Sequence, residues 1–178
     1  MATNKQPIAL GIATHGVAPY GDGVPGTVFE TLPNPVRNAV TFNFSDPTEV
    51  KIDLEGTSAP LYVGFRKDAT DYIEMSLPTP ENAVIKKLMG GEIDTVKDIW
   101  KAPTGGVPDI SFTYKLETET RNGKKVVYTI TNAKVMAKLS QGPTADNPEL
   151  LMVRFYIQNA VSAAGVTGTS FTREVVSA

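Results

Sequence analysis

The segment 49–55 alternates between charged and apolar side chains without interruption. Val50, Ile52 and Leu54 fall on one side of an extended chain, and the four charged residues fall on the other. Successive side chains of a β-strand point to opposite faces, so this pattern is typical of a strand with one face against a core and one face in water. We therefore predict a half-buried strand over 49–55.

Further strands are predicted by runs rich in β-branched residues that are bounded by Gly, Pro, Asn or Asp. The chain holds 20 Thr and 18 Val, residue types that pack well on a pleated surface and lose rotamer freedom in helices. The predicted strands are 8–14, 27–32, 40–44, 61–66, 71–77, 110–120, 125–131, 133–139, 150–160 and 170–176. Many short strands with turn-rich spacing predict a mainly β fold, an antiparallel β-sandwich or barrel of two packed sheets.

One segment carries the signals of a helix. Thr79 offers a capping hydroxyl, Pro80 suits the first helical position, lysines follow late, and Gly90-Gly91 marks the end. We predict one short helix over 79–90, flanking the sheets. A narrow apolar stripe that includes Leu88 would lie on a sheet while the lysines face water.

The stretch 91–108 is too long and too irregular to be a simple connection. It holds the only tryptophan, Trp100, with Asp98 and Lys101 beside it. A tryptophan in such a place can anchor a partner or stack on a sugar, and it can equally anchor the loop on the protein's own core. We expect an interaction loop in which these three residues are candidate contacts between subunits.

The dipeptide Asn122-Gly123 predicts the turn of a long hairpin over 110–131. A two-residue loop pairs Arg121 with Lys124 and mixes polar and apolar groups on both faces. A three-residue loop, with Gly123 left-handed in a bulge, makes one face apolar throughout. It does so by the pairs Thr118–Val126, Leu116–Tyr128 and Tyr114–Ile130. We predict the three-residue loop.

The opposite face of this hairpin is then a polar ribbon. It is expected to pair Glu119 with Lys125 across the strands as opposite charges. The residues proposed for this face, and as candidates to line a channel, are Thr113, Lys115, Glu117, Glu119, Lys125, Thr129 and Thr131.

Composition narrows the classes of function. The 178 residues suit one domain spanning 1–178. Without cysteine there is no disulfide framework, thiolate metal site or cysteine nucleophile. With 17 basic and 19 acidic residues the chain shows no basic patch for tight binding of DNA. No apolar run approaches the length of a membrane helix, and residues 1–7 lack a secretory signal, so we expect the chain to stay in the cytoplasm where it is made.

Two motifs with catalytic or binding potential have simpler interpretations. Residues 21–26 match G-x-G-x-x-G, but a strand-like segment follows where a nucleotide-binding fold needs a helix, and Pro25 removes an amide donor. We expect a flexible turn. His15, the only histidine, has no nucleophile or orienting acid next to it in sequence, so we expect a surface-loop histidine. No cofactor, metal site or catalytic residue is predicted.

The order of these features resembles the major tail tube protein of long-tailed bacteriophages, whose fold is shared by the tubes of contractile injection machines and of type VI secretion. The elements that match are the N-terminal strands, the half-buried strands through Leu77, the capped helix 80–89, the loop around Trp100, the hairpin 110–131 and the late strand 150–158. The resemblance covers nearly the whole chain.

The resemblance implies a structural protein and not an enzyme. Two packed sheets with a flanking helix would form each subunit, with an N-terminal arm and the interaction loop 91–108. Six subunits would close a ring, and rings would stack into a hollow tube through which DNA passes without specific binding. Implied partners are other copies of the chain, a tape-measure protein, and a tail terminator or baseplate protein. The expected location is the virion, after synthesis in the host cytoplasm.

Physical arguments from the strand pattern agree with such an assembly. Sheet edges are a liability in a monomer, and joining the edges of neighbouring subunits into one barrel removes them. The polar ribbon would suit a water-filled channel.

Two other classes of function stay open. One is a carbohydrate- or receptor-binding β-sandwich module of a virion or cell surface, with Trp100 as a stacking group. The other is a hydrolase that uses a pair of carboxylates, drawn from Asp46, Glu49, Asp53 and Glu55.

Overall fold

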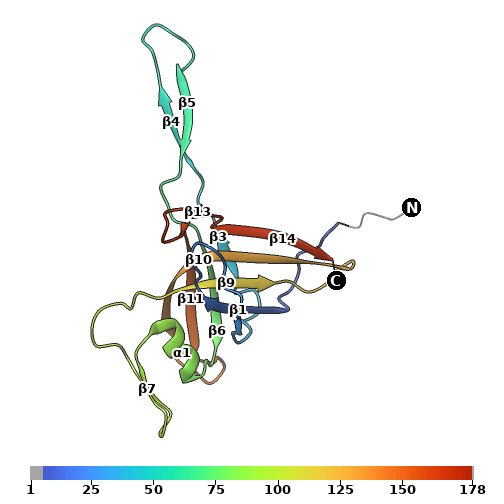
Figure 1. The fold of residues 1–178 in the computed structure, drawn as a ribbon, viewed down its shortest axis with the longest axis vertical. Coiled ribbons are helices and arrows are strands. Elements are labelled where there is room, and N and C mark those ends of the chain that lie inside the picture. Colours follow the sequence, from blue (N-terminus) through green and yellow to red (C-terminus); the bar gives the residue numbers. More distant parts are fainter. Residues whose placement is uncertain (1–5, 178) are drawn as a thin grey trace.

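The computed structural model describes residues 6–177, so the first part of the predicted N-terminal arm lies outside the described residues. It contains antiparallel strands and one helix, as predicted (Figure 1). The strands are β1 (Thr14–Pro19), β2 (Glu30–Thr31), β3 (Thr41–Asn43), β4 (Thr48–Ile52), β5 (Tyr62–Arg66), β6 (Tyr72–Pro78), β7 (Glu92–Asp94), β8 (Ile99–Lys101), β9 (Ser111–Glu117), β10 (Lys124–Gln141), β11 (Leu150–Gln158), β12 (Ala160–Val161), β13 (Thr167–Gly168) and β14 (Phe171–Ser177). The helix α1 (Asn82–Met89) lies between β6 and β7.

The long strand β10 belongs to two layers. One of its sides pairs with β9, and the other side pairs first with β14 over 124–130 and then with β11 over 132–141. One layer is therefore β2-β1-β9-β10-β14, and the other continues from β10 through β11 and β6 to β3. Figure 1 shows the strands of the first layer running across the view and those of the second running along it. Such crossed layers, joined at a corner by a strand that switches sheets, are the orthogonal form of sheet packing.

The core fills the space between the layers. Tyr114 of β9 and Ile130 of β10 meet Ile73 of β6 and Phe155 of β11, and all four are fully buried. The helix adds two apolar side chains to this core, Leu88 and, one turn before it, Ile85. One apolar face from each layer is thus removed from water, which is the main favourable contribution to folding.

The start of the helix differs from the prediction. It begins at Asn82, and the N-cap position is taken by Glu81, whose side chain makes no capping hydrogen bond. Thr79 has a positive φ of 41° and does not cap the helix. The end is as predicted: Gly90 has φ 76°, and its N–H donates to the carbonyl of Lys86.

The hairpin of β9 and β10 has the predicted pairing but a different turn. Leu116 lies opposite Tyr128 and Tyr114 opposite Ile130, so one face is apolar as expected. At the tip, however, Arg121 pairs with Lys124 and the turn holds two residues, both with positive φ. One extra residue in the chain before Arg121 shifts the pairing by one position. The two-residue turn is thereby compatible with the pairing of Leu116 and Tyr128. The predicted three-residue loop is therefore wrong, although the pairs it was meant to explain are right.

Other boundaries also differ. The predicted strands 125–131 and 133–139 are one strand, because the chain passes directly from pairing with β14 to pairing with β11. The segment 8–13 is not a strand, and the first strand starts at Thr14. The loop 91–108 contains the short hairpin β7–β8, which sequence reasoning left irregular.

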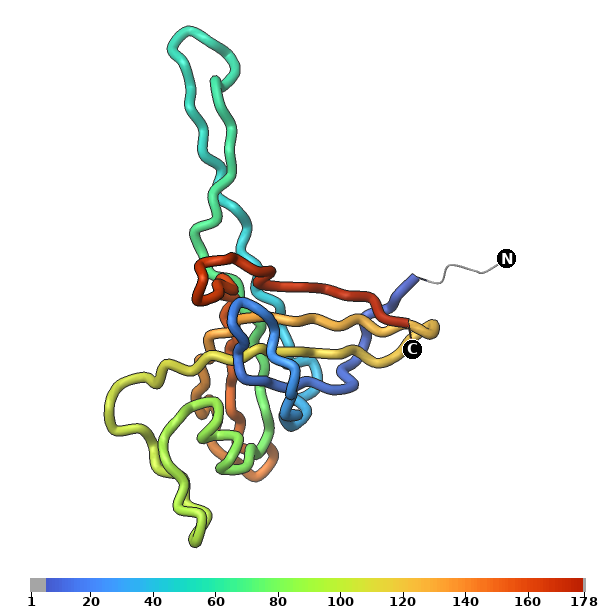
Figure 2. Tube along the Cα trace, viewed as in Figure 1, coloured from blue at the N-terminus to red at the C-terminus, as the bar shows by residue number. Residues whose placement is uncertain are grey.

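The hairpin β4–β5 leaves the body of the molecule. Figure 2 shows it projecting from the end of β3, with its tip far from the layers. We call residues 48–66 the arm. The hairpin β7–β8 projects at the opposite end of the long axis (Figure 1).

Candidate assembly surfaces

The arm is a two-stranded ribbon with apolar side chains on both faces. Val50 pairs with Gly64, and Ile52 pairs with Tyr62, which places one set of apolar groups on one face. Phe65 lies on the other face. Every residue of β4 is exposed.

The strand predicted over 49–55 is present as β4 over Thr48–Ile52, but its predicted half-burial is wrong among residues 6–177. Val50 is 38%, Ile52 is 51% and Leu54 is 49% exposed. The alternation in the sequence is nevertheless strict, and the segment 61–65 adds four more exposed apolar residues. These are Leu61, Tyr62, Val63 and Phe65. An isolated two-stranded hairpin is at best marginally stable in water, so this pattern indicates a face that a partner covers.

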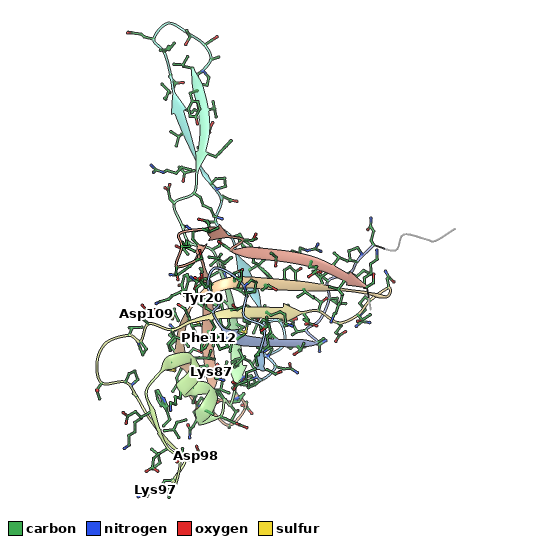
Figure 3. All side chains as sticks on the ribbon, viewed as in Figure 1. Tyr20, Lys87, Lys97, Asp98, Asp109 and Phe112 are labelled. Carbon is green, nitrogen blue, oxygen red and sulfur yellow. The ribbon has the colours of Figure 1, made fainter. Side chains whose placement is uncertain are left out.

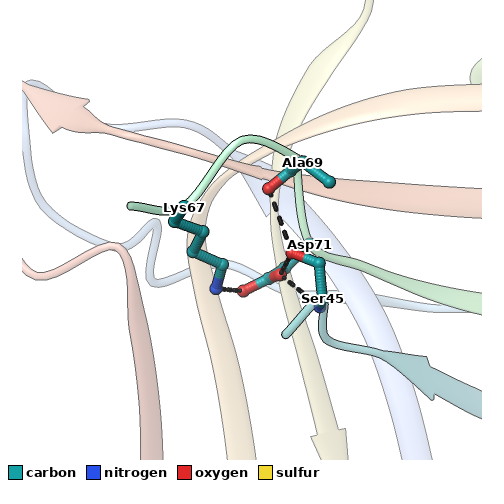
Figure 4. A network of polar contacts seen from close by, with 4 residues as sticks. All are labelled: Ser45, Lys67, Ala69 and Asp71. Carbon is teal, nitrogen blue, oxygen red and sulfur yellow. Dashed lines mark hydrogen bonds and ion pairs between the residues drawn. The ribbon is translucent and has the colours of Figure 1, made fainter. Parts of the chain in front are cut away.

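The base of the arm is held by one carboxylate (Figure 4). Asp71 accepts hydrogen bonds from the backbone N–H of Ser45 at 3.1 Å and from its hydroxyl at 3.2 Å, and it pairs with the ammonium group of Lys67. The Ser45 hydroxyl also contacts the carbonyl of Ala69 at 3.2 Å. Partial burial favours the neutral acid, but the hydrogen bonds from Lys67 and Ser45 outweigh it and lower the pKa of Asp71. The two segments that lead into and out of the arm are thereby tied together.

The polar ribbon face of β9 and β10 carries a charge cluster. Glu117 accepts from Lys125 at 2.6 Å and from Lys115 at 3.0 Å. The hydrogen bond from Lys125 is the main cause of a lowered pKa of Glu117, and the contact with Lys115 adds to it against the effect of burial. Lys115 also lies 4.4 Å from the centre of the Phe29 ring. Lys125 therefore pairs with Glu117 and not with Glu119 as predicted.

The seven predicted ribbon residues are not equally accessible. Thr113 and Thr131 are buried, because the segment before β2 and the turn before β14 cover them: Thr113 Oγ1 accepts from the N–H of Gly26 at 2.8 Å, and Thr131 Oγ1 donates to the carbonyl of Thr169 at 2.6 Å. They therefore hold these loops in place and add no exposed polar surface. The residues Lys115, Glu117, Glu119, Lys125 and Thr129 are partly exposed.

Both outer strands of the first layer have an unpaired side. Among residues 6–177, no strand pairs with the second side of β14, which is seven residues long. At the other edge β2 covers β1 only at Gly16 and Val17. Unpaired edges of this kind are templates for adding a strand from another chain.

The loop 91–108 is anchored by its tryptophan. The indole N–H of Trp100 donates to the carbonyl of Gly90 at 2.9 Å, and the ring packs against the core. Trp100 therefore fixes the loop to the body, while Lys101 and Asp98 stay exposed. Asp98 lies at the tip of β7–β8, next to Lys97 (Figure 3). The amide of Asn82 donates to the carbonyl of Asp98 at 2.7 Å.

The expected surface histidine is buried. His15 lies in β1 at 2% exposure, where its Nε2 is 2.7 Å from the carbonyl oxygen of Pro33 and its ring makes an edge contact with Tyr114. Burial lowers the pKa of His15, and the bond to Pro33 opposes this only in part. His15 and Val17 are two residues apart, so a strand at this place puts both side chains on the core side. This signal was missed because a loop was expected here.

The glycine motif packs against another turn. Gly23 has φ 73°, and a Cβ there would lie 2.9 Å from the N atom of Ser162. Tyr20 donates to the carbonyl of Val161 at 3.0 Å, and Asp22 accepts from the N–H of Ala163 at 2.5 Å. No helix follows the motif. The motif therefore serves close packing between loops, and the predicted flexible turn is tied down.

The carboxylates considered for hydrolysis lie in and next to the arm. Glu49 pairs with Lys51 of its own strand at 3.2 Å, and Asp53 and Glu55 lie towards the tip. Across residues 6–177, no group of three or more His, Asp or Glu side chains is placed to hold a metal ion. Within the same range, no helix has the length and apolarity to span a membrane.

Comparison with known proteins finds no family model and no curated protein that matches the chain.

Proposed function

We propose that this chain is a structural protein whose copies assemble into rings that stack into a tube, and that the tube is that of a bacteriophage tail, a channel for the passage of DNA. The observation that carries the proposal is the exposure of the apolar side chains of the arm. Its sequence alternates as a half-buried strand does, yet its apolar groups are exposed. Within residues 6–177 nothing covers these groups, and in this proposal other copies of the chain bury them.

The free energy gained by burying the arm can be compared with the free-energy cost of association. Burying an exposed apolar side chain contributes about 1.5–3 kcal/mol, so the seven half-exposed groups of the arm would contribute roughly 5–10 kcal/mol. Association costs about 4–15 kcal/mol. The arm alone would therefore give marginal binding, and a stable assembly needs further contacts.

The unpaired edges supply those contacts in the proposal. The unpaired edge at β14 and the unpaired edge at β1 and β2 lie at the two ends of the same layer. The two edges are made of different residues. Contacts between two different surfaces are head-to-tail contacts, which close rings when the rotation allows. Pairing these edges around a ring would form a continuous barrel without free edges. The resemblance to tail tube proteins implies six subunits per ring.

Stacking along the tube is supported by the shape of the molecule. The arm and the hairpin β7–β8 project at opposite ends of the long axis (Figure 1). In a stack, the ring on one side would contact the arm, and the ring on the other side would contact the hairpin β7–β8. The partly exposed ribbon residues would then face the channel with balanced charge, since Lys115 and Lys125 are matched by Glu117 and Glu119. A surface without excess positive charge does not hold phosphates, so DNA would pass without binding.

Negative-stain electron microscopy over a range of protein concentrations tests the proposal. We expect rings or tubes with a central channel above a threshold concentration, and monomers below it. Single particles of one chain at every concentration, confirmed by sedimentation equilibrium, would contradict it.

A further inference from the structure

A groove lies beside the hairpin of β9 and β10. It is a cavity of about 650 Å³ between the segment 9–12, the loop 34–40 and the inner face of the hairpin. Ligand pockets of about 300–1,000 Å³ hold drug-sized molecules, so the groove has room for several side chains. It is an open surface feature and not a sealed void.

The walls of the groove combine polar side chains with apolar side chains that are partly uncovered. Leu116 and Tyr128 contribute from the hairpin, and Phe42 contributes from β3. Leu10 is 59% and Phe42 38% exposed. The ring of Phe42 lies 5.0 Å from that of Tyr128, which fixes its position. An apolar surface fixed by such packing is a site for an apolar partner.

The charges at the rim favour an acidic occupant. Arg37 and Arg121 lie at the groove with one acid, Glu119, which pairs with Arg121. Within residues 6–177 Arg37 has no ion-pair partner. The outer part of the arm, 52–65, has two acids and no basic residue.

The arm of the same chain does not reach this groove. It projects away from the body, and its tip lies far from the segment 9–12 and the loop 34–40 (Figure 2). If the arm is the occupant of the groove, it therefore comes from another copy.

We infer that the outer part of the arm, 52–65, lies in the groove of a second copy. Ile52 and Tyr62, which lie on one face of the arm, supply apolar groups against Leu10 and Phe42. Asp53 and Glu55 then lie at the rim near Arg37. This inference rests on the proposed self-assembly and names the contact that carries it.

Because the chain has no cysteine, single cysteines can report the contact. Ser58→Cys places a thiol at the exposed tip of the arm, and Ala9→Cys places one at the exposed side of the groove. Mixed under assembly conditions and oxidised, the two variants should give a covalent dimer of one copy of each. The control is Ser58→Cys with Ala145→Cys, which lies in the exposed loop between β10 and β11, away from the groove and the proposed contacts.

A charge swap gives a second, independent test. Arg37→Glu should raise the threshold concentration for assembly about two- to five-fold, as expected for the loss of an exposed ion pair. Combining it with Asp53→Arg should restore the threshold.

Two results would overturn the inference. One is assembly without the Ser58–Ala9 dimer, or with an equal yield from Ala145→Cys, which would leave the proposed function standing. The other is the absence of any assembly, which would remove both the inference and the proposed function.

Discussion

The ring of Tyr114 in β9 stacks on the ring of Phe155 in β11, with centroids 4.1 Å apart and planes 16° from parallel. The two strands belong to different layers, so this contact joins the layers at the centre of the core. Tyr114 is fully buried, its hydroxyl donates to the sulfur of Met75 at 3.8 Å, and burial raises its pKa. We therefore expect the stability of the subunit to depend more on this stack than on the exposed arm.

Replacing Phe155 with alanine should destabilise the subunit by about 3–5 kcal/mol, because the change leaves a cavity against Tyr114. This is a large share of the roughly 5–15 kcal/mol that stabilises a typical domain. Urea unfolding followed by circular dichroism measures it. Phe65→Ala, at a side chain 72% exposed, is the matched control and should change stability by less than about 0.5 kcal/mol. Equal losses in the two variants would contradict this account of the core.

Ile52→Asp should abolish or strongly weaken assembly and leave the folded subunit intact. The side chain is 51% exposed and contacts no core, so the free energy of unfolding should change by less than about 0.5 kcal/mol. A charge in a buried contact between copies, in contrast, is costly. Sedimentation velocity and thermal unfolding measure the two effects. Ala145→Asp, in the exposed loop between β10 and β11, is the control and should assemble normally; normal assembly of Ile52→Asp would exclude the arm as a contact.

Asp71→Asn should loosen the arm at its base. The variant loses the ion pair with Lys67 and weakens the bond from Ser45, at a cost of about 1–2 kcal/mol. Nuclear magnetic resonance order parameters should fall in β4 and β5 and stay unchanged in β9. Asp68→Asn removes only the exposed pair with Arg66 and is the control. An unchanged arm in the Asp71 variant would show that the network does not hold it.

The same network predicts a response to acid. The folded state lowers the pKa of Asp71 below its usual 3.8, so its stabilisation is complete above that pH and is lost as the pH falls through the folded value. Arm order in the wild type should therefore decrease only below about pH 4. In Asp71→Asn, arm order should not depend on pH in this range.

His15 predicts a second dependence on pH, at higher values. Burial lowers its pKa from the usual 6.5, so the unfolded chain binds a proton before the folded chain does. Stability should be constant above about pH 7 and should fall as the pH decreases below 6.5. Urea unfolding between pH 5 and 7.5, compared with His15→Gln, measures this. A slope that survives in the variant would assign the effect to another group.

Much of the fold follows from local patterns in the sequence. Alternation located β6, β9 and β11 to within a few residues, and Gly90 gave the end of the helix. The apolar face of the hairpin gave the pairs Leu116–Tyr128 and Tyr114–Ile130, because a shift by one residue would turn that face to the solvent.

The errors arose where long-range contacts decide the structure. The continuity of β10 depends on β14 and β11, which lie later in the chain. The burial of Thr113 depends on Gly26, distant in sequence. The exposure of Val50 depends on the absence of a covering element within residues 6–177, and alternation alone does not show whether the cover comes from the same chain or another.

Hydrogen exchange of the arm tests the central claim most directly, because it asks whether other copies cover residues 48–66. Exchange should be compared by mass spectrometry below and above the concentration at which particles form. We predict rapid exchange of β4 and β5 amides in the monomer and strong protection in the particle, with β11 protected in both. Rapid exchange of the arm in assembled particles, or no concentration dependence at all, would contradict the account.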